Sequence, residues 1–571
     1  MASASEVYTL QPAANQPELP EKWSPAEKWW VGAVIVIVVL VNSLPYLYGY
    51  LSTPEGMKFM GIMLDVPDHA QYFSWMRDLS TQNLVSNKLT PEPNSPLFFN
   101  LLWWALGRLG RLLGVDYAVM YQVLRVSATA IFLLLAYRIC RWFLKDDWTR
   151  KTAFLLVTFT SGFGWVLIVI KYISGGELLM PLNVFIAEGN TFLGALGYPH
   201  FLAAAVYIFT FELILRGQAK NQLRYAVAAG VFALFLGWQH AYDLVTIYAI
   251  LLAYALLLVI RDRKLPWYMI WSGGIVGVIS VWPAIYSVWL TSFDPVWKGV
   301  LKQFANAGVY TPNPLQLPIL FGITFLLALF ALVRSNPLKL KRFDNGQLFV
   351  TAWFLVTFIL IYLPVDYQIH LLNGWQVPMA ILAAQGFSRY ILPWISVWLE
   401  TTFLRMEKGR LRNAAALQRW AMIGLIFVVL PTNLYLWSWR FLDLSRHTYP
   451  YYLSNAEINA MTWLEKNAKP DEVVFSSLTT GQYIPMLTGA HAYLAHWAQT
   501  LDFFGKSDRV ADFFAKEAQP KQQKTILQEG NVQYIFFGPA EQALGSAGLT
   551  GLPGLTVVFS DGPVTVYQVM R

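Results

Sequence analysis

Two carboxylates and an imidazole lie close together in the segment LDVPDHAQYFSWMRDL, as Asp65, Asp68 and His69. On a short helix or turn, positions three apart share a face, so both carboxylates can serve one site. Such a cluster fits a general base, or a divalent metal held by oxygen ligands with the imidazole beside them. The structural alternative is that Asp68, which follows Pro67, caps the start of a helix.

Three later segments carry further polar residues between apolar runs. These are Glu188 and His200 around GNTFLGALGYPH, His240 and Asp243 in GWQHAYD, and Asp366, His370 and Gln376 in VDYQIHLLNGWQ. Ionisable groups at membrane depth are costly and usually face a cavity, so we expect these residues to contribute to a substrate site. Taken singly, each histidine also fits a hydrogen-bonded structural role, and Asp243 also fits a helix cap.

Basic and aromatic residues supply candidates for phosphate and sugar contacts. Arg125 stands at the start of an apolar run and is a candidate bidentate donor to a lipid phosphate, or else an interfacial snorkelling arginine. Lys298 and Lys302 are weaker phosphate candidates. His491 and His496 lie five apart in GAHAYLAHW and share neither a helical nor a strand face. A zinc pair is therefore not expected there, and one of the two is a candidate for an acceptor or sugar surface.

The elements that must position these residues are mostly membrane spans. The chain of 571 residues is 56% hydrophobic and only 13% charged, whereas soluble domains carry about a quarter charged residues. Since a span needs roughly 20 apolar residues, we predict about eleven spans. They lie near 29–50, 118–142, 152–172, 199–215, 225–239, 243–260, 267–290, 315–333, 348–364, 376–395 and 420–440. The stretch 97–114, interrupted by Arg108 and Arg111, is predicted to be an amphipathic helix in the interface.

The distribution of basic residues predicts the orientation. Lys and Arg gather on one side of the predicted spans, roughly 22 against 8, which places the N-terminal tail 1–28 in the cytoplasm. An odd number of spans then places the large loop 51–117 and residues 441–571 outside, with 29–440 as the transmembrane module. The net charge of +8 is thereby explained by topology, so we expect no nucleic-acid partner. A multi-pass protein of a bacterial-type inner membrane is predicted.

Residues 441–571 have the pattern of a compact, soluble α/β domain. NAEINAMTWLEKNA and KTILQEG are predicted helices, while DEVVFSS and VQYIFFGP are predicted strands. LTVVFSDGPVTVYQV reads as two alternating runs joined by an Asp-Gly turn, which predicts a β-hairpin.

The order of these motifs resembles the GT-C superfamily of polyprenyl-phosphate-sugar-dependent glycosyltransferases, in a bacterial form. The resemblance is carried by DHAQYFSWMRD, SPLFFNLLWWALGRL, YQVLRVSATAIFLLLAYRI, NTFLGALGYPHFLAAA and HLLNGWQVPMAILAAQGF. It implies a mainly α transmembrane bundle with an external domain, and a catalytic acid in the first external loop. Asp68 matches that position best and Asp65 second, as general base or metal ligand. Many members have two adjacent acids here, whereas His69 follows Asp68, so dependence on Mg²⁺ or Mn²⁺ stays open.

The resemblance implies transfer of a hexosyl or pentosyl group from a polyprenyl-phosphate donor to a glycan, lipid or protein acceptor on the external face. Membrane lipid would surround the donor. Two alternatives belong to other functional classes. Charges deep in the spans and inverted internal repeats would favour a transporter or flippase for lipid-linked sugars. The sequence shows few such charges and no repeat. A non-catalytic membrane subunit would bind a partner through the external domain.

Overall fold

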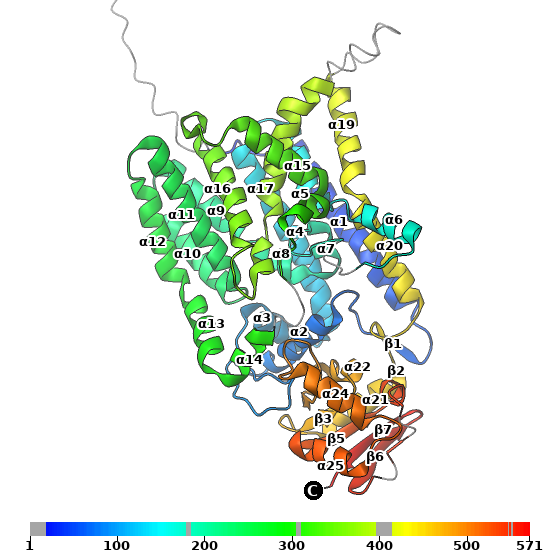
Figure 1. The fold of residues 1–571 in the computed structure, drawn as a ribbon. Helices are drawn as coiled ribbons and strands as arrows, with labels where there is room; N and C mark the ends of the chain where they lie inside the picture. Colours follow the sequence, from blue (N-terminus) through cyan, green and yellow to red (C-terminus); the bar gives the residue numbers. More distant parts are fainter. Residues whose placement is uncertain are drawn as a thin grey trace, which may run out of the picture.

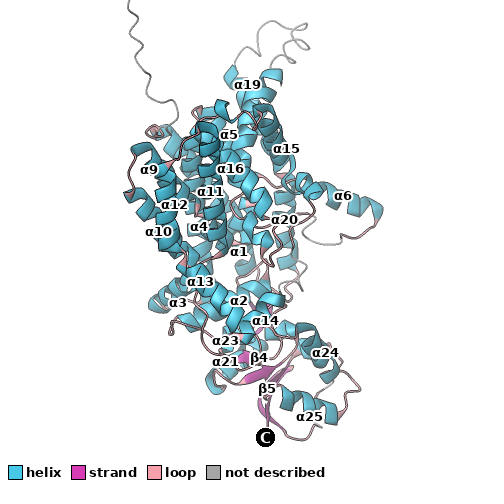
Figure 2. Cartoon of the chain, turned by 60° about the vertical axis from the view of Figure 1, so that its left-hand side comes forward, coloured by secondary structure: helices cyan, strands magenta, loops and turns pink. Residues whose placement is uncertain are grey.

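The computed structural model describes residues 19–178, 184–303, 310–395, 414–545, 548–549 and 552–570. Residues 1–18 of the predicted cytoplasmic tail lie outside this part. A helical bundle occupies most of the molecule, and the strands gather near the C-terminus (Figures 1 and 2). The first half of the bundle comprises α1 Pro25–Leu51, α4 Tyr117–Phe143, α5 Asp147–Phe159, α6 Gly164–Ser174, α7 Thr191–Gly197, α8 Pro199–Ala205, α9 Ile208–Lys220 and α10 Arg224–Gly237.

The second half of the bundle continues with long and bent helices. These are α11 Tyr242–Asp262, α12 Trp267–Ser280, α13 Trp282–Phe293, α14 Pro295–Gln303, α15 Leu317–Ser335, α16 Asn345–Leu360, α17 Gln376–Gly386, α19 Ala414–Val429 and α20 Pro431–Ser445. Three short 3₁₀ helices, η3 Pro314–Gln316, η4 Leu340–Arg342 and η5 Gln368–Leu372, connect them, and the π-helical turn η6 Phe387–Ile391 follows α17.

Five helical segments are long and apolar enough to cross a membrane, or up to eight if each bent helix pair is one span. The bent pairs are α5 with α6, α12 with α13, and α19 with α20. Their breaks fall inside the predicted spans 152–172, 267–290 and 420–440, where Gly162, Pro283 and Pro431 stand. The chain is a multi-pass membrane protein, and the predicted count of about eleven spans stays a prediction.

Residues 225–260 form two separate helices in the bundle. α10 has 14 residues, and α11 begins five residues after α10 ends and has 21. α10 is shorter than the roughly 20 residues that a perpendicular span needs. The predicted segments 225–239 and 243–260 are thus separate helices, while the number of membrane crossings that α10 contributes stays a prediction.

Between α1 and α4, the chain forms β1 Met57–Phe59, α2 Val66–Leu79 and α3 Leu101–Leu113. α3 is the predicted amphipathic helix, with Trp103, Leu106, Gly107 and Gly110 on its buried face. Figure 1 shows α2 and α3 between the bundle and the C-terminal strands.

The C-terminal part is built around a mixed sheet with strand order β4-β3-β5-β7-β6. β3 Val473–Phe475 pairs parallel with β4 His491–Ala492 and β5 Val532–Phe537, whereas β5, β7 Val564–Val569 and β6 Leu555–Asp561 pair antiparallel. The helices of this part are α21 Asn455–Asn467, α22 Leu478–Gly481, α23 Ile484–Thr488, α24 Phe503–Phe513, α25 Pro520–Glu529 and α26 Pro539–Gln542.

The predicted helices, strands and hairpin of this part are confirmed. α21 packs on the sheet through Trp463, whose ring lies 6.0 Å from that of Tyr534. From α24, Phe513 packs on Phe475 of β3, with ring centroids 4.6 Å apart. The apolar runs of β3 and β5 are buried almost throughout, whereas the alternating run of β6 is half-buried or exposed.

Candidate active site

The helix α2 carries Asp68 and is fixed from the bundle side by α3. A Cβ atom on Gly107 would lie 2.3 Å from the carbonyl oxygen of Met76, so the close approach of the two helices requires glycine. From α3, Arg108 donates from Nε to the carbonyl of Leu79 at 3.0 Å. The arginines that interrupt the apolar stretch 97–114 therefore help to hold the end of α2.

The C-terminal part fixes the same loop from the other side. β1 pairs antiparallel with β2 Tyr452–Ser454, so the loop contributes a strand to a two-stranded sheet with the C-terminal part. Arg77 at the end of α2 forms an ion pair of 2.7 Å with Glu465 of α21. Asn87 donates to the carbonyl of Gln499 at 2.8 Å. α2 is thus clamped between the bundle and the C-terminal part.

Asp68 lies in the first turn of α2 and pairs with His496, 428 residues away in sequence, at 2.6 Å between Oδ1 and Nε2. The other ring nitrogen of His496, Nδ1, accepts the backbone N–H groups of Ala498 and Gln499, at 3.0 and 3.3 Å. Since Nδ1 is an acceptor, the proton lies on Nε2, which donates it to Asp68. The N-cap of α2 is Asp65, without a side-chain capping bond. The capping role considered for Asp68 is therefore wrong.

The pKa values of the two aspartates are shifted in opposite directions. Burial raises the pKa of Asp65, and the negative charge of Asp68 raises it further, well above its ordinary value. Burial also opposes ionisation of Asp68, but the hydrogen bond from His496 and the nearby imidazoles outweigh this and lower its pKa. Asp68 therefore keeps its negative charge more readily than Asp65, a division typical of acid–base sites.

Asp68 and His496 line a cavity of about 370 Å³ between α2, the bundle and the C-terminal part. Four of the chain's seven histidines line it, namely His200, His240, His370 and His496. The sequence therefore identified separate polar segments that the fold brings into one cavity. Among the described residues, neither Lys nor Arg lines this cavity.

Carboxylates behind the cavity orient two of the imidazoles. His240 Nδ1 lies 2.9 Å from Asp243 Oδ2, and His370 Nδ1 lies 3.1 Å from Glu188 Oε1. A carboxylate that accepts the Nδ1 proton leaves Nε2 for a ligand and stabilises the protonated imidazole. The N-cap of α11 is Ala241, so Asp243 supports His240 rather than capping the helix.

Aromatic side chains form much of the remaining wall. Tyr72 stacks on Trp103 with ring centroids 4.5 Å apart, and Tyr242 stacks on His370 at 5.5 Å. At the α13 end the wall includes Val288, which is 64% exposed on the outer surface of the bundle. The cavity therefore joins a polar end at Asp68 to an apolar end at a helix surface suited to lipid.

Several predicted site residues, among them Arg125, Gln376 and Asp366, do not line the cavity. Arg125 is buried and donates to the carbonyl of Ala195 at 3.2 Å and to the Ser43 hydroxyl at 2.7 Å, so its guanidinium joins α4 to α7 and α1. Gln376 is buried and donates to Thr191 at 3.3 Å, and Asp366 is exposed. Lys298 and Lys302 lie on the exposed face of α14 and likewise do not contribute to the lining.

The proposed metal ligands Asp65, Asp68 and His69 do not converge on a shared ion. His69 is fully buried, with Nδ1 2.7 Å from the carbonyl of Asp65 and Nε2 3.1 Å from the Tyr121 hydroxyl. Both ring nitrogens thus have protein partners, and Oδ1 of Asp68 is taken by His496. Within the described ranges, no group of three or more His, Cys, Asp or Glu residues is arranged to hold a metal. We therefore derive no catalytic step through a metal.

The architecture is similar to that of solved membrane glycosyltransferases. A crystal structure of the Archaeoglobus fulgidus oligosaccharyltransferase, tethered with an acceptor peptide, aligns with a TM-score of 0.56 at 13% identity, over 89% of this chain and 69% of that one. The mycobacterial arabinofuranosyltransferase AftD aligns with a TM-score of 0.52 at 14% identity, over 97% of this chain and 41% of that one. The chain has the GT-C fold. No family model and no curated protein matches the sequence.

The pairing of Asp68 with His496 is the contact at this site that sequence reasoning missed. His496 was considered only for an acceptor or sugar surface, because its spacing from His491 argued against a shared ligand. His491 instead contacts the carbonyl of Thr90 at 2.9 Å, and only His496 of the two lines the cavity. The only available signal was the unusual occurrence of histidine in an apolar segment, which does not identify a partner.

Proposed function

We propose that this protein is an inverting membrane glycosyltransferase that uses a polyprenyl-phosphate sugar, with Asp68 as the base toward the acceptor. The observation that carries the proposal is the ionised Asp68, held by His496 at the wall of a cavity that reaches the lipid-facing helix α13. The GT-C fold supports it, and the Archaeoglobus enzyme has been solved with an inhibitory peptide and a dolichol-phosphate.

The reaction follows from the chemistry of the donor. An acceptor hydroxyl or amide attacks the anomeric carbon, the bond from that carbon to the phosphate oxygen breaks, and the lipid phosphate leaves with the bonding electrons. The phosphate is already a good leaving group, so the protein must orient both partners and accept the proton of the nucleophile. Asp68 accepts that proton late, as the new bond makes the nucleophile more acidic.

The imidazoles are suited to the donor phosphate. His240 and His370 each have a carboxylate at Nδ1, which leaves Nε2 of each for a hydrogen bond with the phosphate. No Lys or Arg among the described lining residues competes for this role. The aromatic wall supplies faces for the sugar, since Tyr and Trp rings combine apolar area with polar edges. The external location of the acceptor is part of the proposal and rests on the predicted orientation.

The test is Asp68→Asn in the purified full-length chain, supplied with a labelled polyprenyl-phosphate sugar and a membrane extract as acceptor source. Loss of a positioned base costs about 10²- to 10⁴-fold in rate, so kcat should fall by at least about 100-fold. Asp116→Asn is the matched control, because Asp116 caps α4 in the same loop and Asn caps equally well.

Unchanged transfer by Asp68→Asn would remove Asp68 from the mechanism. If the wild-type protein moves the lipid-linked sugar across vesicles without transferring it, the transporter alternative replaces the proposal. If it binds neither donor nor acceptor, the chain is the non-catalytic subunit considered from the sequence.

A further inference from the structure

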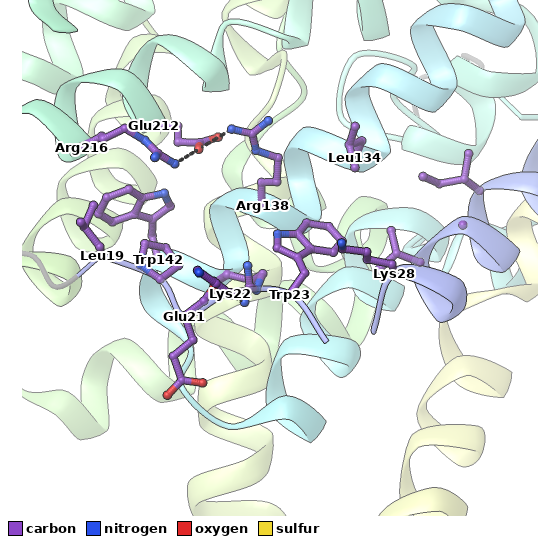
Figure 3. Close-up of a pocket in the computed structure, with 15 residues that line it drawn as sticks. Leu19, Glu21, Lys22, Trp23, Lys28, Leu134, Arg138, Trp142, Glu212 and Arg216 are labelled. Atoms are coloured by element: carbon purple, nitrogen blue, oxygen red, sulfur yellow. Dashed lines mark hydrogen bonds and ion pairs between the residues drawn. The ribbon is translucent and has the colours of Figure 1, made fainter. Parts of the chain in front are cut away.

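A second cavity of about 560 Å³ lies at the opposite end of the bundle from the C-terminal strands (Figures 1 and 3). It is formed where the N-terminal end of α1 meets the C-terminal end of α4 and the helix α9. α1 and α4 are both long and apolar enough to span a membrane. The cavity therefore lies at a boundary between membrane and water, far from Asp68.

The lining is strongly basic. Five basic side chains and two acidic ones line it, which leaves an excess of three positive charges; they are Lys22, Lys28, Arg138, Arg141 and Arg216, with Glu21 and Glu212. Among the described residues, the ammonium groups of Lys22 and Lys28 have no ion-pair partner. In Figure 3, the side chain of Glu21 extends away from Glu212 and its arginines.

The arginines in this cavity are held in place by the protein. Arg138 and Arg216 share Oε1 of the buried Glu212, at 2.6 and 3.0 Å (Figure 3). Two guanidinium groups on one carboxylate leave a net positive charge. Arg141 donates to the carbonyl of Glu21 at 2.6 Å, which fixes the segment that carries Lys22. The site is thus preorganised for an anion.

An apolar part continues from the basic one along the bundle surface. Val31, Gly32 and Ile35 of α1 and Leu134 of α4 line it, and Leu134 is 41% exposed. A Cβ atom on Gly32 would meet no atom within 4 Å, so the space beside α1 is open there. Trp23 and Trp142 frame the basic part, as tryptophans do at headgroup level.

We propose that this cavity binds an anionic phospholipid, with its headgroup phosphate at Lys22, Lys28 and the arginines and an acyl chain beside Gly32. A soluble anion would need only the basic part, whereas the adjoining apolar groove at the ends of two spans fits a lipid. Basic pockets between membrane helices are established sites for anionic headgroups. This inference does not depend on the proposed transferase activity.

The test is native mass spectrometry of the purified full-length chain with equal amounts of phosphatidylglycerol and phosphatidylcholine of the same acyl chains. We expect wild-type protein to retain phosphatidylglycerol preferentially. Lys22→Gln with Lys28→Gln should reduce that preference by about 30-fold, since each of the two cations contributes about 1 kcal/mol near the surface and about 1.36 kcal/mol corresponds to a factor of ten. The control is Lys264→Gln with Lys341→Gln, which removes two exposed lysines outside the cavity.

A second pair of variants tests the acyl-chain part. Gly32→Phe should reduce bound phosphatidylglycerol by filling the groove, while Gly273→Phe should not, although it also has open space around its Cβ position. Equal losses in both lysine pairs would show a general charge effect and overturn the proposal. Displacement of the lipid by inorganic phosphate at the same concentration would overturn it as well, in favour of a soluble anion.

Discussion

Removal of the His496 side chain should shift the acid limb of the pH–rate profile. In the wild-type protein, His496 donates to Asp68 at 2.6 Å and helps to lower the pKa of that carboxyl against the effect of burial. A hydrogen bond to a charged group contributes about 1.5–3 kcal/mol. Since 1.36 kcal/mol corresponds to one pKa unit, His496→Ala should raise the pKa of Asp68 by about 1–2 units.

The sign of the shift follows from the role of the carboxylate. Transfer requires ionised Asp68, so the rate falls as the pH drops through its pKa. That fall should occur about 1–2 pH units higher in His496→Ala than in the wild type. The assay is kcat/KM for transfer of a labelled sugar measured across pH, with folding at each pH checked by thermal unfolding.

A matched control separates this effect from loose docking of the C-terminal part. His491 also contacts the first loop, through the carbonyl of Thr90 at 2.9 Å, but does not line the cavity. His491→Ala should leave the acid limb at its wild-type pH, even if the rate falls at all pH values. The role assigned to His496 would be refuted if the pKa of the acid limb in His496→Ala lay within about 0.3 pH units of the wild-type value, a margin of about 0.4 kcal/mol.

Two further predictions concern Asp65 and the imidazoles. Because burial and the charge of Asp68 raise the pKa of Asp65, its neutral form is favoured, and Asp65→Asn should retain activity within about threefold, a change below 1 kcal/mol. A loss as large as that of Asp68→Asn in the same transfer assay would instead indicate a metal-ligand role. If His240 and His370 hold the donor phosphate, replacing either with Gln removes one hydrogen bond to a charged group. The KM for the donor should then rise by about tenfold, and an unchanged KM would exclude that contact.

Much of the fold was predictable because the patterns were local. The Asp-Gly turn between two alternating runs gave the β6–β7 hairpin, and the helix that ends at Gly530 matches α25. Span number was harder, since α12 and α13 bend by 48° within one apolar run. Hydropathy sums over such a run and does not register a change in helix direction.

The site was only partly predictable, for a related reason. Glu188, His200, His240 and His370 were recognisable because polar residues in apolar surroundings are costly. The pairing of Glu188 with His370 depends on packing between segments 182 residues apart in sequence, as does the gathering of the three histidines in one cavity. Arg125 shows the converse, because a buried arginine with carbonyl and hydroxyl partners has the same sequence context as one that holds a phosphate.

The contact between Asp68 and His496 joins the C-terminal part directly to the proposed base. Asp68 is partly buried, and burial alone would favour its neutral form. The donor that keeps it ionised comes from a segment that reaches α2 only when the C-terminal part is docked through β1–β2 and the Arg77–Glu465 ion pair. Docking of the C-terminal part and formation of the proposed base are therefore coupled. A chain whose C-terminal part is displaced would retain Asp68 but lose the hydrogen bond from His496 that lowers the pKa of this carboxyl.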